Sequence, residues 1–567
     1  MEFGKFEDIK YVRPDFKKAS KDIKNNVKVM KSAANYEEFK KAYVNTEEIL
    51  KEVITMGTIA SIRNTIDTTD KFYDEEEKYI NKASAPLSLA MLSLANTVLK
   101  SKYKEDIKKD YGQFIIQDLE MSKKVMSPKI ILLSIKEGAL TQKYSKDVAA
   151  CKTNFRGEEC NFYGLLKHMQ STDRVERKEA FIAWADLYAS ISDNLDELYT
   201  KLIDLRVKKA KRLKFDSFID YSYIARGRYD YTKEEVAKFR EAVKKYIVPL
   251  CSKLYEKQVK DLEIDKLHWY DEELTFKEGN ATPIGTEEEL VEKARIMYHE
   301  LSKETGEFFD FMCEHKLFDL TTRPGKHLGG YCTFIPNYKA PFIFSNFNGT
   351  SADVDVLTHE AGHAFQAYLG SRNIELMNQM SSTSEINEIH SMSMEHFTYP
   401  FMDKFFGENV DKYRYHHLVK SIEVIPYLVS VDAFQHAIFE NPKMSAMERR
   451  ATWKKIEEEF MPWRDYDGNE FLGQGGFWMQ KQHIFLYPFY YIDYALAQTC
   501  AYQYFLKGLD NFSDAFDGYM NLCKLGGTKG YFALLKESNL DNPFEEETVK
   551  WISEKISKVI DEFESKL

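Results

Sequence analysis

The stretch SADVDVLTHEAGHAFQAYLG, residues 351–370, decides how the fold around it is built. Ser351 can cap a helix, and Asp353 lies in the first turn, where an acid favours a helix start. The apolar residues recur at near-helical spacing: Val354, Leu357, Ala361, Ala364, Phe365 and Tyr368. The stretch therefore predicts a helix with one anchored face and with His359 and His363 one turn apart.

The two histidines and the glutamate between them are typical of a catalytic metal site. Residues four apart on a helix differ by roughly 40° in azimuth and roughly 6 Å in height, so His359 and His363 can reach one ion. Glu360 lies roughly 100° around the helix, beside such an ion, where it suits a base acting on metal-bound water. The alternative is an ordinary amphipathic helix, because a chain with 13 histidines produces this motif by chance in roughly a few per hundred cases.

Gly362 is unusual inside a helix, where glycine costs about 1 kcal/mol relative to alanine. It predicts the close approach of another backbone or of a substrate at this point. Simple tolerance of the glycine is the alternative.

A third metal ligand is expected from a second helix. A hydrolytic zinc site uses three protein ligands and leaves the fourth position to water. The hydroxyl residues at 381–384 resemble a turn and a cap. One face of the helix that follows carries Glu385, Glu388, Ser391, Met392 and Glu395. Glu388 is the predicted ligand, with Glu385 as its rival. Glu395 is predicted to orient a ligating histidine without binding the metal itself. His390 projects about 200° from Glu388 and is predicted not to bind the metal.

These motifs resemble those of the oligoendopeptidase F family, which is related to thimet oligopeptidase. In that family the motif is H-E-x-G-H, and a glutamate 29 residues after the first histidine opens an E-x-x-S-x-x-x-E stretch. Glu388, Ser391 and Glu395 fit this pattern. The strand-like segments at 329–333 and 341–350 also match, so the resemblance covers residues 323–396, whereas the N-terminal part shows only a compatible helical character.

The resemblance implies a mainly α fold: a large, two-lobed helical metallopeptidase with a deep substrate channel and a small β-sheet next to the metal helix. It implies one Zn²⁺ ion and endopeptidase activity on short unstructured oligopeptides. Gly329, Gly330 and Tyr331 would present their backbone to an extended peptide as an added strand. A peptidyl dipeptidase or other exopeptidase on the same scaffold is the alternative. A helical binding protein with a structural metal, or none, is disfavoured by Glu360, since a closed site has no use for an unligated acid.

A second group of polar and aromatic residues lies further along the chain. Offsets of 4, 7, 8 and 11 predict one helical stripe made of His483, Tyr487, Tyr490, Tyr491 and Tyr494. On periodicity alone a packed aromatic face is favoured, because the chain has 35 tyrosines. The resemblance instead implies that Tyr491 or Tyr494 stabilises the oxyanion, with Tyr490 as a competitor for Tyr491, His483 nearby and Tyr487 contacting substrate. Pro488 can start or kink this helix.

Composition limits the partners and the compartment. The formal charge is 79 minus 90, or −11, and no basic stripe interrupts it, so nucleic acid is not expected. The first residues carry acids and no apolar core, and no apolar run of membrane-spanning length follows, so neither secretion nor a membrane is expected. Seven cysteines without C-x-x-C spacing indicate reduced thiols of a cytoplasmic protein. A monomer or a weak homo-oligomer is expected.

Helix should dominate the 567 residues, with amphipathic helices predicted at 36–62, 187–213 and 233–262. Only the stretch 328–347 has the character of strands. No Pro/Ser-rich linker, repeat or low-complexity tract divides the chain. We therefore expect an N-terminal helical lobe at residues 1–200 and a catalytic region at 201–567, together forming one cooperative unit.

Overall fold

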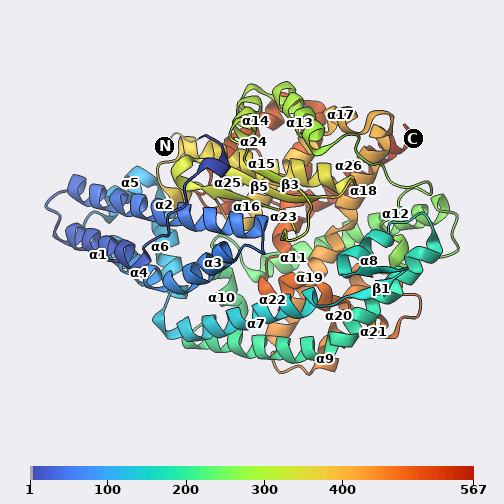
Figure 1. Cartoon of the computed structure of the whole chain (residues 1–567), viewed down its shortest axis with the longest axis horizontal. Helices are drawn as coiled ribbons and strands as arrows, with labels where there is room; N and C mark the ends of the chain where they lie inside the picture. Colours follow the sequence, from blue (N-terminus) through green and yellow to red (C-terminus); the bar gives the residue numbers. More distant parts are fainter. Residues whose placement is uncertain (1–3, 328) are drawn as a thin grey trace. The chain divides into compact units, whose positions relative to one another are not determined.

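The computed structural model describes residues 4–327 and 329–567, and it is mainly helical (Figure 1). Within these ranges it has 26 α-helices and five short strands. The prediction of a mainly α fold is confirmed. Residues 1–3, at the start of the acidic N-terminal segment, and Leu328, which opens the predicted strand stretch, lie outside the described residues.

The contacts divide the chain into two compact units, each assembled from three stretches of sequence. Unit 1 contains residues 1–126, 282–410 and 500–541, and unit 2 contains residues 127–281, 411–499 and 542–567. The predicted boundary near residue 200 falls inside the helix α9 (Arg174–Arg212). The division by contacts differs from the sequence-based one because the chain passes between the units several times, without a linker composition at the crossings.

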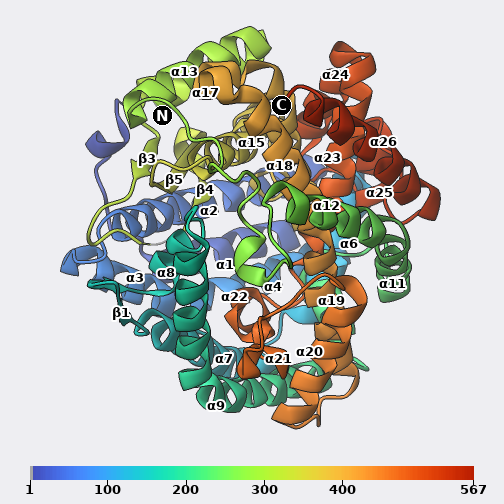
Figure 2. The same cartoon turned by 90° about the vertical axis from the view of Figure 1, so that its right-hand side faces the viewer.

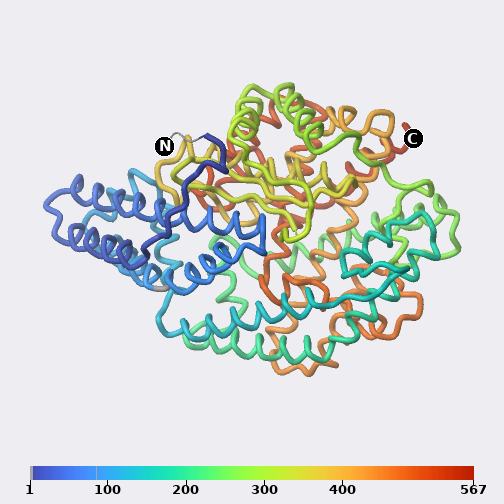
Figure 3. Tube along the Cα trace, in the orientation of Figure 1, coloured from blue at the N-terminus to red at the C-terminus, as the bar shows by residue number. Residues whose placement is uncertain are grey.

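Unit 1 begins with a group of packed helices, drawn in blue in Figure 3. These are α1 (Phe16–Ser32), α2 (Tyr36–Ile66), α3 (Lys71–Ala83), α4 (Ala85–Lys100), α5 (Lys104–Tyr111) and α6 (Gln113–Val125). The side chains of Asp15, Asn35 and Asp70 cap α1, α2 and α3 by accepting hydrogen bonds from backbone N–H groups in the first turn. A buried apolar cluster that includes Phe39 and Leu94 holds α1, α2, α4, α5 and α6 together.

A three-stranded sheet in unit 1 supports the metal motif. Its strands are β3 (Phe318–Thr321), β4 (Tyr331–Ile335) and β5 (Ala340–Phe347), in the order β3-β5-β4. The central strand β5 pairs parallel to β3 and antiparallel to β4, and all but one of its side chains are buried. The helix α15 (Ala352–Asn373) packs on β4 and β5. The small sheet next to the metal helix is therefore present, with β4 at its edge.

The remaining helices of unit 1 come from its second and third stretches of sequence. They are α13 (Glu287–Leu301), α14 (Lys303–Glu314), α16 (Ser384–Phe397), α17 (Asp403–Phe406), α24 (Phe512–Leu525) and α25 (Tyr531–Glu537). Both α16 and α24 pack against α15. The Tyr519 hydroxyl of α24 donates to the carbonyl of His390 in α16 at 3.0 Å, which joins these two helices.

Unit 2 is helical apart from one hairpin (Figure 2). Its first stretch contains α7 (Ile131–Ala149), β1 (Thr153–Phe155), β2 (Glu158–Cys160), α8 (Phe162–His168), α9, α10 (Phe218–Ala225), α11 (Lys233–Ala242) and α12 (Val248–Asp261). Its later stretches contain α18 (Val410–Glu423), α19 (Ile425–Glu440), α20 (Ala446–Phe460), α21 (Glu470–Gly473), α22 (Gln482–Leu486) and α26 (Glu546–Glu564). The helix α23 (Ile492–Asp510) crosses from unit 2 into unit 1 at residue 500.

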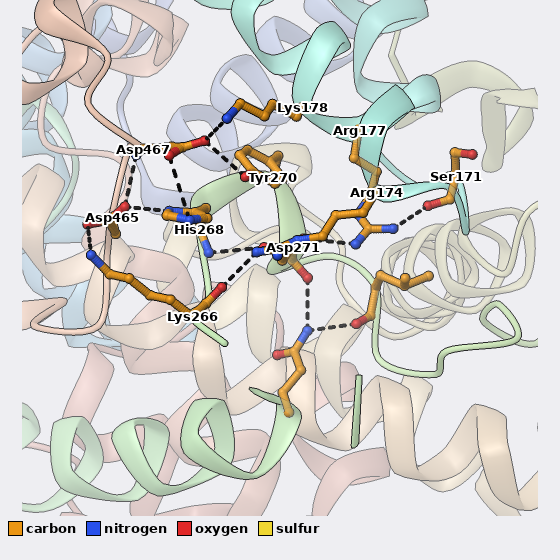
Figure 4. Close-up of polar contacts among 12 residues, drawn as sticks. Ser171, Arg174, Arg177, Lys178, Lys266, His268, Tyr270, Asp271, Asp465 and Asp467 are labelled. Carbon is orange, nitrogen blue, oxygen red and sulfur yellow. Dashed lines mark hydrogen bonds and ion pairs between the residues drawn. The ribbon is translucent and has the colours of Figure 1, made fainter. Parts of the chain in front are cut away.

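A buried acid joins α9 to a loop of unit 2 (Figure 4). Asp271 has no exposed side-chain surface and accepts hydrogen bonds from Arg174 and Arg177, each at 2.8 Å. Buried charges are tolerated only when they are paired and hydrogen-bonded in this way. The neighbouring Tyr270 hydroxyl donates to Asp467 at 3.1 Å, which ties a second loop to the same place.

One segment of the described residues, Asp403–Glu440, is long and apolar enough to meet the length and composition criteria of a membrane span. Its most apolar window has a mean hydropathy of 1.2, and 78% of that window is buried inside the protein. Burial of this kind is typical of a core helix.

Candidate active site

Gly362 brings the two helices of the metal motif into backbone contact. A Cβ atom at this position would lie 2.5 Å from the carbonyl oxygen of His390 and 2.6 Å from the Cα of Ser391, both in α16. No side chain fits there, so the glycine lets α15 and α16 approach each other. The predicted close approach of another backbone is confirmed.

The structure brings together the three predicted metal ligands. His359, His363 and Glu388 each offer one donor atom, and these atoms lie within 4.8 Å of one another. The Oε2 atom of Glu388 is 3.3 Å from Nε2 of His359 and 3.4 Å from Nε2 of His363. Glu385, the rival ligand, does not belong to this group. His390 is fully buried and is also outside the group, as predicted.

Outer contacts orient two of these ligands. Nδ1 of His359 lies 2.6 Å from Oε1 of Glu395, and the Ser391 hydroxyl donates to Oε2 of Glu388 at 3.0 Å. A carboxylate accepts, so Nδ1 of His359 carries a proton, and Nε2 is the nitrogen that a metal would bind in place of its own proton. Two imidazole nitrogens and one carboxylate oxygen with such supports fit a divalent metal ion.

The charges of the site act on three titrating groups. Burial opposes the charged forms, but His363 and His359 hold the pKa of Glu388 well below its usual range. Burial also opposes the charged form of His359, yet hydrogen bonds with Glu388 and Glu395 raise its pKa well above the usual value. Burial raises the pKa of Glu360, and the two histidines only partly offset this. Glu388 therefore stays ionised, as a ligand must, while Glu360 has the higher proton affinity of the two carboxylates.

The backbone before β4 passes next to Glu360. A Cβ atom at Gly330 would lie 3.7 Å from Oε1 of Glu360 and 3.4 Å from the carbonyl oxygen of Phe344. Gly329 has a φ of 93°, and its carbonyl accepts a hydrogen bond from Asn346 at 2.7 Å. The glycines thus place β4 close to the acid, and the predicted role of Gly329 and Gly330 in binding substrate stays a prediction.

Tyr331 is anchored at both ends of its side chain. Its ring stacks on Phe344 with the centroids 4.9 Å apart, and its hydroxyl lies 2.6 Å from Oγ1 of Thr65 in α2. The hydroxyl is therefore engaged within unit 1, and the backbone of Tyr331 is the part left for the predicted strand addition. Thr65 is a partner that the sequence patterns did not indicate.

A cavity of about 560 Å³ lies beside β4 within unit 1. Its lining combines Tyr331, Cys332 and Thr333 with residues of α2, α3 and α4, among them Val53, Ile54, Ile62, Ile80 and Leu87. Burial, together with the charge of Glu360, raises the pKa of the Cys332 thiol well above its usual range. Cys332 is thus a protonated thiol at the boundary between the cavity and Glu360.

The predicted helical stripe in unit 2 is wrong, because the helix is interrupted. α22 ends at Leu486 and α23 begins at Ile492. Between them Pro488 has no N–H to donate, Phe489 takes a φ of 61°, and the N–H of Phe489 donates to Oε1 of Gln435 at 2.9 Å instead of continuing a helix. The side chain of Phe489 is fully buried, which stabilises this unusual backbone.

The rings nevertheless gather around His483. Its ring centroid lies 4.9 Å from that of Tyr491, 5.7 Å from Tyr490, 5.9 Å from Tyr487 and 6.3 Å from Tyr494. Tyr487 is 54% exposed, whereas Tyr491 is 9% exposed. The predicted residues thus lie together without a continuous helix, and their catalytic roles stay predictions.

Residues 167–553 match the model of peptidase family M3, and residues 6–126 match that of the peptidase M3 N-terminal domain. The chain belongs to peptidase family M3. It is 22% identical over 528 residues to the oligoendopeptidase F homolog of Borreliella burgdorferi, covering 88% of this chain and 87% of the relative. The solved structure of PZ peptidase A with an inhibitor is 40% identical and superposes with a TM-score of 0.95 over 99% of this chain and all of the other. Oligoendopeptidase F from Enterococcus faecium, 16% identical, shares the fold with a TM-score of 0.64 over 97% of this chain and 98% of the other.

These matches confirm an oligoendopeptidase F-family metallopeptidase. Membership in family M3 implies a metal ion and peptide substrates, and the group of His359, His363 and Glu388 is the place in unit 1 that suits the ion.

Two arginines of this M3 peptidase were not indicated by the sequence patterns. Arg228 donates to the carboxylate of Asp493 and to the carbonyl of Phe489, and Arg226 donates to Asp493 at 3.1 Å. The guanidinium of Arg226 also lies 4.7 Å from the ring centroid of Tyr490. The two arginines therefore fix the loop that carries the tyrosines. In the sequence, only the short stretch Arg226-Gly227-Arg228 after α10 could have indicated this role.

Proposed function

We propose that this M3 peptidase is a zinc-dependent endopeptidase that hydrolyses internal bonds of short, unstructured oligopeptides. The observation that carries the proposal is the group of His359, His363 and Glu388 with the unligated acid Glu360 beside it. Three protein donors of nitrogen and oxygen, with one position left for water, are the pattern of catalytic zinc. A structural site would instead be closed by a fourth ligand.

His359, His363 and Glu388 would hold the zinc ion. When bound, zinc supplies Lewis acidity that polarises the scissile carbonyl and makes water a better nucleophile. Glu360 accepts the proton of the attacking water and passes it to the departing amine. Glu395 holds the His359 ring so that Nδ1 stays protonated and Nε2 points to the site.

The peptide substrate would bind along the exposed side of β4. Backbone groups of Gly329, Gly330 and Tyr331 would pair with an extended peptide, which gives affinity with little dependence on sequence. The position of Gly330 against Glu360 supports this proposal. The family resemblance extends the proposal to unit 2, with Tyr491 or Tyr494 as hydrogen-bond donor to the oxyanion and His483 nearby.

Cleavage of end-blocked peptides of increasing length, with and without a chelator, tests the proposal. We expect internal cleavage of blocked peptides, loss of activity on chelation and recovery with zinc. Cleavage only of peptides with a free terminus would favour the exopeptidase alternative instead. Activity that survives complete removal of metal would overturn the metal mechanism.

Three variants test the assigned roles. Glu360→Gln should bind zinc normally and lose about 10²- to 10⁴-fold in turnover, because general base catalysis contributes about that much. Glu388→Ala should lose zinc, whereas Glu385→Ala, one turn earlier on α16, should keep it. Zinc lost only from Glu385→Ala would exchange the two assignments.

The protein is further proposed to be a cytoplasmic monomer or weak homo-oligomer. All seven cysteines are free, which is usual where glutathione and thioredoxin keep thiols reduced. Light scattering coupled to gel filtration measures the mass in solution, and cell fractionation tests the compartment. A stable large oligomer, or recovery of the protein outside the cytoplasm, would contradict these proposals.

A further inference from the structure

A second group of side chains that could hold a metal ion lies in unit 2, on the hairpin β1–β2 and on α8. Figure 2 shows where β1 and α8 lie. Glu158 and Cys160 are two residues apart on β2, so their side chains leave the same face of the strand. His168 follows at the end of α8. Each of the three residues offers one donor atom, and these atoms lie within 4.8 Å of one another.

His168 is oriented by a carboxylate in the manner of a metal ligand. Its Nδ1 atom lies 2.6 Å from Oε1 of Glu176 in α9. Because a carboxylate accepts, Nδ1 carries the proton in the neutral ring, and Nε2 keeps a lone pair. Glu176 is itself held by the Ser171 hydroxyl at 3.1 Å and by Arg156 at 3.2 Å. Outer carboxylates of this kind fix the tautomer and the angle of ligating histidines.

The local fold supports the approach of α8 to the thiol. Asn161 caps α8 by accepting a hydrogen bond from the N–H of Gly164 at 2.9 Å. A Cβ atom at Gly164 would lie 3.4 Å from Sγ of Cys160, so glycine keeps the helix close to the sulfur. The turn after α8 is anchored as well, since Arg177 donates to the Ser171 carbonyl at 2.8 Å and to Asp271 (Figure 4).

The donor set points to a particular class of cation. Thiolate, imidazole and carboxylate together favour zinc and its borderline-soft relatives over magnesium or calcium, which prefer oxygen alone. Burial and the charge of Glu158 raise the pKa of Cys160, so its thiol is protonated until a metal displaces the proton into solvent. The three ligands leave one position for water.

We propose that Glu158, Cys160 and His168 form a second transition-metal site, which binds a zinc-class ion and clamps the hairpin to α8. This site is separate from the group on α15 and α16, because its three residues lie in unit 2. It also differs in chemistry, since the group on α15 and α16 contains no sulfur.

The difference in sulfur gives a direct test with Co²⁺ as the probe. Only a thiolate ligand gives a sulfur-to-cobalt charge-transfer band in the near ultraviolet. We expect the metal-free full-length chain to develop this band on titration with Co²⁺ and to saturate at one equivalent of thiolate-bound cobalt. Cys160→Ser should abolish the band. Cys151→Ser, a free cysteine from the same part of unit 2, is the matched control and should retain it.

Two further variants keep the proposal falsifiable if Cys160→Ser folds poorly, which circular dichroism would reveal. His168→Gln keeps the thiol and should weaken cobalt binding at this band. Glu176→Gln removes only the orienting charge and should weaken it by about 10- to 100-fold. Zinc content by mass spectrometry should fall by one ion per chain in Cys160→Ser, while peptide cleavage stays. Absence of the band in wild type, or a band of unchanged affinity in both His168→Gln and Cys160→Ser, would overturn the site.

Discussion

Gly362 sets the distance between the helix that carries both histidines and the helix that carries Glu388. The gap at this point is too small for a methyl group, because the atoms opposite belong to the backbone of α16. A neighbouring backbone cannot move aside as the end of a long side chain can. The ligand geometry therefore depends on one missing side chain.

Gly362→Ala should push α15 and α16 apart. We expect a loss of about 1 to 3 kcal/mol in stability, as for other overpacked cores, despite the better helix propensity of alanine. Zinc affinity should fall with it, because His359 and His363 move relative to Glu388. Chelator competition measures the affinity, and circular dichroism on heating measures the stability.

Gly138→Ala in α7 is the matched control, since a Cβ atom there has no neighbour within 4 Å. It should be neutral or stabilising by about 0.5 to 1 kcal/mol. Equal effects of the two substitutions would show that the contact with α16 does not matter.

Glu395 controls the ring of His359 through a single hydrogen bond. Glu395→Ala should weaken zinc binding by about 10- to 100-fold, which is the usual cost of losing an outer carboxylate. Glu395→Gln keeps an acceptor oxygen, so its zinc affinity should lie between those of the wild type and Glu395→Ala. Zinc affinity by chelator competition is the measurement, and an unchanged affinity in Glu395→Ala would remove the assigned role.

At the scale of elements, the sequence predicted helices well wherever no proline interrupts them. The stretch 36–62 lies within α2, and 187–213 overlaps α9. The stretch 233–262 contains a π-helical turn, Val243–Ile247, ahead of Pro249, because proline cannot donate the next backbone hydrogen bond. The same physical cause, a proline, interrupts the stripe at Pro488.

Some residues of the candidate site could likewise be predicted from the sequence, and others could not. Helical spacing alone predicted that His359 and His363 share one face, and Glu388 was preferred to Glu385 on the polar face of the next helix. The cluster around His483 does not follow from spacing, because it depends on a turn held by Gln435 and by Arg228, which are more than 50 residues away in sequence. Long-range contacts of this kind leave no periodic pattern.

The start of α23 depends on the buried carboxylate of Asp493. Asp493 is fully buried and accepts hydrogen bonds from Arg226 and Arg228, and Arg228 is 2% exposed. Asp493→Ala would leave the buried guanidinium of Arg228 without its carboxylate. We expect a loss of about 3 to 5 kcal/mol in the free energy of unfolding, measured with urea.

Asp186→Ala on α9 removes an exposed acid from the same unit and serves as the control. It should change the free energy of unfolding by less than about 0.5 kcal/mol. A loss of similar size in both variants would mean that the pairing with Arg226 and Arg228 contributes nothing specific.

At the scale of the molecule, the boundaries of the two compact units were not visible in the sequence. Each unit combines segments that are hundreds of residues apart, and the crossings carry no linker composition. All six tryptophans lie in unit 2, namely at 184, 269, 453, 463, 478 and 551. Tryptophan fluorescence therefore reports on that unit.

Two histidines, the half-buried His416 and the buried His436, make unit 2 sensitive to acid. Burial lowers the pKa of His416 to about 3, and burial lowers that of His436 to about 4, with Arg240 and Arg228 acting in the same direction and Asp432 against it. Both rings stay neutral in the folded state, with Nδ1 of His416 2.7 Å from Thr275 and Nε2 of His436 3.3 Å from the Tyr223 hydroxyl. In the unfolded chain each histidine takes up a proton near pH 6.5.

The unfolded state therefore binds more protons as the pH falls from about 6.5 towards 4, and the stability of unit 2 decreases over this window. We expect a slope of about 1.4 kcal/mol per pH unit for each histidine, measured by urea unfolding followed through tryptophan fluorescence. His436→Gln should flatten the slope by that amount below pH 6.5 and leave it unchanged above. A slope that is the same in wild type, His416→Gln and His436→Gln would show that these rings are not the source of the acid sensitivity.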